Sequence, residues 1–238
     1  MSLSTKLNIV FEDDFLLVIN KPTGMVVNIS ETSQFNTVQE LLQKKLKLDP
    51  EDKSEFGQRG GVVHRIDKDT SGLLVVAKNE KVFNGLKAQF ISRDVKKEYL
   101  ALVLGEVEEG NFEVSAPLKR NPKNRLKMAV VRGGKEAVTR FELIKVVDEG
   151  QMEASLLKCY PETGRTHQIR VHLACLNHPV VGDEIYMTKK QQSLVAETYK
   201  RLMLHAWKIK LVHPITKENL ALEASLPTEF QALYSKPY

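Results

Sequence analysis

A dense run of polar side chains separates two apolar segments near residue 65. The run covers residues 64–72, with the sequence HRIDKDTSG, and apolar residues 61–63 and 73–77 flank it. Because both flanking segments have the length and composition of strands, we expect Asp67 at the end of a strand, with Arg65 on the same face. A carboxylate held rigidly beside a cation is suited to act as a nucleophile or a general base.

Two other interpretations of this run stay open. In the first, the residues form a turn without a catalytic role, in which Asp and Ser side chains bond the local backbone and Gly72 adopts a positive φ. An Asp-x-Asp pair after an apolar strand is also typical of haloacid-dehalogenase-like phosphatases, which need magnesium. That pattern requires Thr or Val where this chain has Ser71, and His64 and Arg65 interrupt the apolar strand that it requires.

A second polar cluster, residues 163–170 with the sequence TGRTHQIR, begins a helical pattern that we expect over residues 166–177. Backbone amides at a helix N-terminus attract phosphate or carboxylate, and Arg165 could bind either group through a bidentate fork. Alternatively, Thr163 or Thr166 only caps the helix. Taken alone, Tyr99 is most simply a core residue of a predicted strand over 97–105, with its hydroxyl at the edge.

The composition is that of a globular protein, since 42% of the 238 residues are hydrophobic and 27% are charged. The two cysteines, Cys159 and Cys175, form no Cys-x-x-Cys pair, which predicts free thiols and a cytoplasmic location. We expect no metal site, because no histidine cluster has metal-ligand spacing. No apolar run is long enough for a membrane span, and residues 1–6 contain no signal-peptide core. We expect a monomer, because no long apolar helix face is exposed.

Positive charge is concentrated in one segment of a chain whose formal net charge is +5. Residues 117–140 contain eight Lys or Arg and one acidic residue, Glu136. Turn sequences at 121–124 and 133–135 predict a hairpin, an arm that would carry these cations into a nucleic-acid groove. The alternative is an ordinary solvated surface.

The remaining pattern predicts an α+β fold with a large mixed, mostly antiparallel sheet and flanking helices. We expect strands over 7–11, 15–19, 97–105, 137–147, 152–160, 204–212 and 220–224. We expect helices over 37–48 and 80–91, a helical turn over 230–234, and a loop over 49–60. No linker is evident, so residues 1–238 are predicted to form a single domain.

Together these motifs resemble the RluA-type pseudouridine synthases, and the resemblance runs in order from residue 11 to residue 214. Asp67 matches the catalytic aspartate of that family, Tyr99 its active-site tyrosine, and Arg165 the arginine paired with the aspartate. Supporting matches are Asn20-Lys21-Pro22-x-Gly24, Gly182-Asp183-x-x-Tyr186 and Leu204-His205-Ala206. Two features depart from the family: Ile66 replaces the usual Leu, and we expect this chain to lack the small N-terminal α-L RNA-binding domain that several members carry.

The resemblance implies an isomerase that detaches uracil from ribose, rotates it and rejoins it through carbon 5, without cofactor or metal. Asp67 would act at carbon 1′ as a nucleophile or at carbon 2′ as a base, and Arg165 would keep it ionised. Tyr99 would stack on the base, which must leave its stack to reach the site. The substrate would be ribosomal or transfer RNA, and the alternative is an idle RNA-binding protein on the same fold. The residues expected to contact RNA are His64, Arg65, Thr70, Lys119, Arg120, Lys123, Arg125, His167, Gln168 and Leu204.

Overall fold

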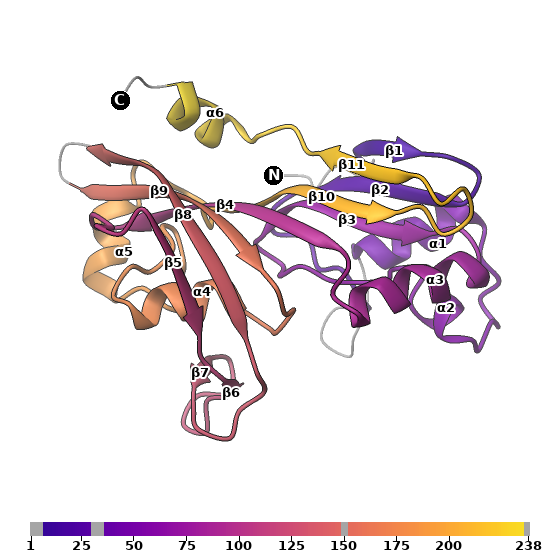
Figure 1. Cartoon of the computed structure of the whole chain (residues 1–238), viewed down its shortest axis with the longest axis horizontal. Helices are drawn as coiled ribbons and strands as arrows, with labels where there is room; N and C mark the ends of the chain where they lie inside the picture. The colour runs from indigo at the N-terminus through magenta and orange to yellow at the C-terminus, as the bar shows by residue number, and fades with distance from the viewer. Residues whose placement is uncertain (1–6, 30–35, 149–151, 236–238) are drawn as a thin grey trace. The chain divides into compact units, whose positions relative to one another are not determined.

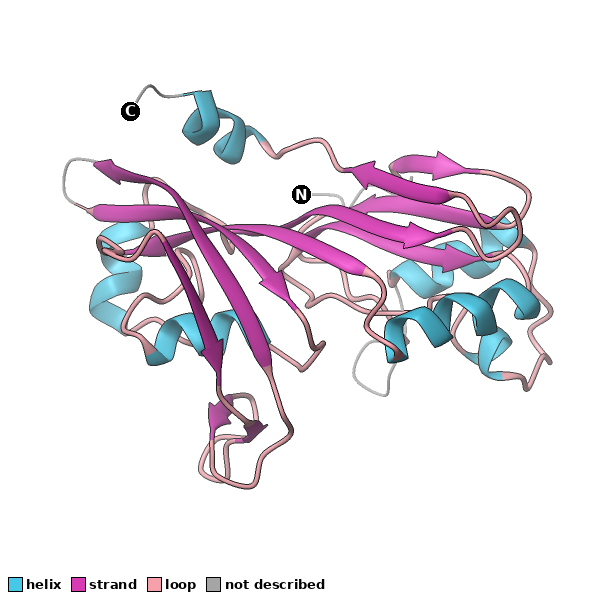
Figure 2. Cartoon of the chain, viewed as in Figure 1, coloured by secondary structure: helices cyan, strands magenta, loops and turns pink. Residues whose placement is uncertain are grey.

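The computed structural model describes residues 7–29, 36–148 and 152–235 (Figure 1). Residues 1–6, where we predict no signal-peptide core, lie outside this description. The chain divides into two compact units, one of Met1–Lys96 with Ala206–Ser225 and one of Lys97–His205 with Leu226–Tyr238. Strands predominate in both, with short helices beside them, so the predicted α+β class is confirmed (Figure 2). A single domain, in the sense of one catalytic unit, stays a prediction.

The first unit is a sheet with the strand order β1-β2-β3-β10, to which β11 adds beside β10. Its antiparallel pairs include β1 with β2, β2 with β3, and β10 with β11. Every residue of β3 is buried, and Leu73, Val75 and Ala77 pack with Val82 and Phe83 of the helix that follows. The elements are β1 (Ile9–Glu12), β2 (Leu16–Lys21), β3 (Ser71–Ala77), β10 (Leu204–Val212), β11 (Asn219–Glu223), α1 (Val38–Leu46), α2 (Glu55–Gln58) and α3 (Glu80–Ile91).

The second unit contains an antiparallel sheet with the order β4-β9-β8-β5. A separate hairpin of β6 and β7 projects beyond the ends of β5 and β8 (Figure 1). The elements are β4 (Lys96–Leu104), β5 (Asn111–Ser115), β6 (Leu118–Arg120), β7 (Met128–Val130), β8 (Val138–Asp148), β9 (Glu153–Pro161), α4 (Gln168–Cys175), α5 (Lys189–Val195) and α6 (Thr228–Ser235).

Three local predictions are wrong. Residues 61–63 form no strand but a single bridge between Val62 and Val76, because Gly60 and Gly61 turn the chain there with φ of 60° and 76°. Asp67 therefore lies in a loop that leads into β3, not at a strand end. The predicted loop over 49–60 contains α2, which Ser54 caps. The helix expected from residue 166 begins at Gln168, after His167 in a left-handed conformation.

Candidate active site

A buried lysine, Lys21, holds the loop of residues 64–70, which carries Asp67. The ammonium of Lys21 lies 2.8 Å from the carbonyl oxygen of Lys68 and 2.9 Å from those of Pro22 and Met25. Lys21 is fully buried, so its three N–H donors must find partners inside the protein. A second bond, from the Thr23 hydroxyl to the carbonyl oxygen of Asp69, measures 2.7 Å. The last residue of β2 and the turn after it thus fix the two residues that follow Asp67.

The two ends of this loop are also anchored. Nε2 of His64 accepts a hydrogen bond of 3.0 Å from the amide of Val75, and its ring stacks on Phe90 at 4.5 Å. Just beyond the other end, Gly72 of β3 has a φ of 113°, and a Cβ there would lie 2.2 Å from the carbonyl oxygen of Ala206. The close approach of β3 to β10 therefore requires glycine at this position.

The predicted contact residues of the loop differ in exposure. Arg65 is exposed, and its side chain forms no hydrogen bond or ion pair with a described residue. Thr70 is 2% exposed, and its hydroxyl has no hydrogen-bond partner among the described residues. Ile66 is buried and Asp67 is partly exposed. The loop thus keeps its apolar residue inside and presents Arg65 to solvent.

The other predicted site residues lie in the second unit. Tyr99 stands in β4 opposite Cys159 of β9 and is partly exposed. Arg165 precedes α4, and its Nε donates a bond of 2.9 Å to the carbonyl oxygen of Glu136. Leu204 begins β10 and is 3% exposed. The pairing of Arg165 with Asp67 stays a prediction.

Gln168 fixes the turn that presents Arg165. Its Nε2 donates to the Val138 carbonyl and the Thr139 hydroxyl, both at 2.9 Å. Its Oε1 accepts from the Thr163 hydroxyl at 2.6 Å and from the Arg165 amide at 3.0 Å. These four bonds fill the capacity of the side-chain amide group, and Gln168 as a whole is 4% exposed. In this structure Gln168 therefore positions Arg165 from inside the protein.

The basic segment forms the predicted hairpin, with β6 paired to β7. Asn121 and Asn124 fix its turn, since their side-chain oxygens accept amide hydrogens of residues 123, 124 and 126. Four cations on the hairpin are exposed and form no ion pair with a described residue: Lys119, Arg120, Lys123 and Arg125. We call this hairpin, residues 118–130, the arm.

Two groups of residues beyond the predicted set organise these elements. Lys21 grips the Asp67 loop, and Arg170 forms a buried pair with Asp183, with N–O distances of 2.7 and 2.9 Å. Both motifs were visible in the sequence, as Asn-Lys-Pro-x-Gly and Gly-Asp-x-x-Tyr. No local pattern showed that Lys21 is buried, because a lysine at the end of a strand is usually exposed.

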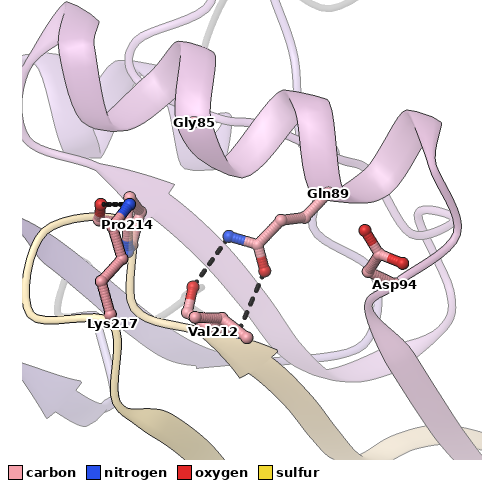
Figure 3. A pocket seen from close by; sticks show the side chains of 6 residues that line it. All are labelled: Gly85, Gln89, Asp94, Val212, Pro214 and Lys217. Carbon is pink, nitrogen blue, oxygen red and sulfur yellow. Dashed lines mark hydrogen bonds between the residues drawn. The ribbon is translucent and has the colours of Figure 1, made fainter.

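An open pocket of about 300 Å³ lies in the first unit, between α3 and the turn after β10 (Figure 3). The Gln89 side chain bridges the amide and carbonyl of Val212 there. None of the predicted site residues lines this pocket. Among the described residues, no group of three or more His, Cys, Asp or Glu could hold a metal ion, and no helix is long and apolar enough to cross a membrane.

Comparison with known proteins gives consistent matches. The family model described as RNA pseudouridylate synthase matches residues 15–175. Ribosomal large subunit pseudouridine synthase D of Nitrosomonas europaea is 43% identical over 232 residues, which cover 95% of this chain and 64% of that protein. The protein of the same name from Zymomonas mobilis is 42% identical over 238 residues, which cover 96% of this chain and 72% of the relative. The structure of human RNA pseudouridylate synthase domain containing 1 has a TM-score of 0.75 and 26% identity, and covers 100% of this chain and 98% of the human chain.

Proposed function

Because the chain belongs to the RNA pseudouridylate synthase family, we propose that it isomerises uridine to pseudouridine in large-subunit ribosomal RNA. Family members are isomerases that act on uridines in RNA. The choice of ribosomal over transfer RNA rests on the names of relatives that this chain matches over 64% and 72% of their length. Two free thiols fit a cytoplasmic site of action.

Asp67 is the catalytic residue of the proposal. The main observation in support is the hydrogen bond from the buried Lys21 ammonium to the carbonyl oxygen of residue 68, which fixes the backbone beside the Asp67 carboxylate. Rigid placement of a reacting group is a main source of catalytic power. In the reaction the bond from N1 to carbon 1′ breaks, the bond from carbon 5 to carbon 1′ forms, and N1 gains a proton as carbon 5 loses one. No electrons are gained or lost, so the residues need supply only a nucleophile or base and proton transfer.

The other residues hold the substrate in this proposal. Tyr99 stacks on the uracil, and Arg165 pairs with the Asp67 carboxylate and orients it. Arg65, exposed and without a partner among the described residues, fills the space that the flipped base leaves in the RNA. The four exposed cations of the arm contact the RNA backbone.

The test is pseudouridine mapping of total RNA from cells that contain the wild-type protein, Asp67→Asn or no protein. We expect one or a few sites in large-subunit ribosomal RNA to be modified only with the wild-type protein, and purified Asp67→Asn to bind RNA within several-fold of wild type. Sites only in transfer RNA would refute the substrate assignment. Full modification with Asp67→Asn would refute the role of the carboxylate, and an unchanged map in cells without the protein would favour an idle RNA-binding protein.

A further inference from the structure

One tyrosine hydroxyl joins the arm to the start of α4. The hydroxyl oxygen of Tyr186 accepts the amide hydrogen of Met128, where the turn of the arm closes, over 2.8 Å. The same oxygen lies 2.9 Å from Nδ1 of His167, the residue that precedes α4. The hydroxyl proton of Tyr186 is therefore available to His167 while its oxygen holds the arm.

The backbone of Tyr186 is held by residues outside the arm. Its backbone amide and that of Ile185 donate to a carboxylate oxygen of Asp183, at 3.0 and 2.9 Å. Asp183 is fully buried and forms two bonds to Arg170 of α4. The Arg170 guanidinium lies 5.3 Å from the centre of the Tyr186 ring. The buried ion pair of Asp183 with Arg170 of α4 thus fixes the position of the Tyr186 side chain.

The contact with His167 matters for the turn before α4. His167 has a φ of 55°, a left-handed conformation that is unfavourable for residues with a Cβ, and no side chain caps the helix there. Two residues earlier, Arg165 is held by Gln168 through its amide. Through its contact with His167, the Tyr186 hydroxyl stabilises the left-handed conformation that connects the turn of residues 163–167 to α4.

We propose that Tyr186 is a positioning residue that couples RNA contact at the arm to the placement of Arg165. RNA that orders the arm orders Met128, whose amide shares the Tyr186 hydroxyl with His167, and so orders the turn of residues 163–167. The inference rests on the proposed function, because it requires that the arm binds RNA and that Arg165 takes part in the reaction.

Tyr186→Phe tests the coupling, because it keeps the ring beside Arg170 and removes only the hydroxyl. Its effect is measured in the wild-type background and with Lys119, Arg120 and Lys123 changed to alanine, in a double-mutant cycle. The substrate is an in vitro transcript of large-subunit ribosomal RNA. We expect Tyr186→Phe alone to lower kcat about tenfold with KM changed less, the size expected for one or two hydrogen bonds. In the arm-neutralised background, we expect it to lower kcat less than about threefold. Equal losses in both backgrounds would overturn the proposal.

Tyr160→Phe is the matched control. Tyr160 lies in β9 of the same unit, and its hydroxyl donates to Glu142 over 2.8 Å without contacting the arm or α4. We expect this change to affect kcat equally in the two backgrounds, whatever it does to the melting temperature.

A second measurement tests the coupling without catalysis, so it separates this inference from the proposed function. Hydrogen exchange of the amides of residues 165–168 is compared with and without the same transcript. We expect bound RNA to slow this exchange at least about fivefold in the wild-type protein and by less than about twofold in Tyr186→Phe. Equal slowing in both proteins would overturn the coupling, even if the transcript is bound but not modified.

Discussion

Replacing Lys21 by methionine should separate the stability of the fold from the placement of Asp67. The change keeps an unbranched side chain of similar length and removes the ammonium that three carbonyl oxygens accept from. Hydrogen bonds to a charged group make net contributions of about 1.5–3 kcal/mol each, which would sum to about 4.5–9 kcal/mol for three independent bonds. The three bonds share one ammonium, so their contributions are not additive and the loss is smaller than this sum. We therefore expect the free energy of unfolding to fall by about 2–4 kcal/mol, which leaves a typical domain folded at 25 °C.

The effect on activity should be larger than this loss of stability implies. Without the ammonium, the Thr23 hydroxyl is the one described donor of this turn that still bonds the loop after Asp67. A displacement of about 1 Å at a reacting group costs about a hundredfold in rate, and we expect kcat for pseudouridine formation to fall by about that factor.

The measurement combines urea unfolding with single-turnover kinetics on an RNA transcript, at a temperature where the variant is folded. Lys78→Met is the matched control, because Lys78 pairs with Glu12 at 2.9 Å in the same unit and forms no bond with residues 64–70. It should lose stability and keep its kcat. If Lys21→Met loses stability but keeps kcat within about threefold of wild type, the ammonium does not position Asp67 and the argument fails.

Three further predictions concern the cations of the arm, Arg165 and the buried His205. Neutralising Lys119, Arg120 and Lys123 should weaken RNA binding and reduce the slope of log K against log salt by about 0.7–0.9 for each phosphate that the arm no longer neutralises; an unchanged slope would make the arm an ordinary surface. Arg165→Ala should lower kcat and reduce the free energy of unfolding by only about 1 kcal/mol, because the partly exposed Arg165 side chain donates to the Glu136 carbonyl. A large loss of stability with a proportionate loss of activity would show that Arg165 has a structural role. Burial, with a smaller effect of the nearby Arg201, lowers the pKa of His205 to about 3, so the unfolded chain gains a proton below pH 6.5 that the folded protein does not. The stability this histidine contributes is complete above pH 6.5 and should fall by up to about 1.4 kcal/mol per pH unit towards pH 3; urea unfolding at several pH values should show a flatter dependence for His205→Gln, and an equal dependence would contradict the assignment.

Much of the fold could be predicted from periodicity alone. The strand over Leu204–Val212 and the helix over Glu80–Ile91 have the predicted bounds, because an alternating or apolar run and a polar cap mark their ends. The start of α4 was missed because His167 adopts a left-handed conformation that the sequence THQ does not signal. A contact with Tyr186, nineteen residues away, supports that conformation, and such contacts leave no local pattern.

The candidate site shows the same division between local and distant causes. Residue type and spacing made Asp67 and Arg165 candidates only, with a simple turn and a helix cap as open alternatives, and their roles were expected from the family resemblance. The burial of Gln168 could not be predicted from the sequence, because its four hydrogen bonds join it to residues 138, 139, 163 and 165, which only the folded chain brings together. Gln168 was accordingly expected to contact RNA, whereas its side chain is occupied inside the protein.

Lys21 and Thr23 hold the Asp67 loop through main-chain oxygens, and this has a consequence for which positions of the loop can vary. Lys21 and Thr23 hold the carbonyl oxygens of residues 68 and 69, which every amino acid provides. Lys68, whose side chain is exposed, can therefore be exchanged without loosening the loop. A position next to the proposed catalytic carboxylate is thus open to variation, and its side chain can be selected for a particular RNA while the geometry of Asp67 is inherited unchanged.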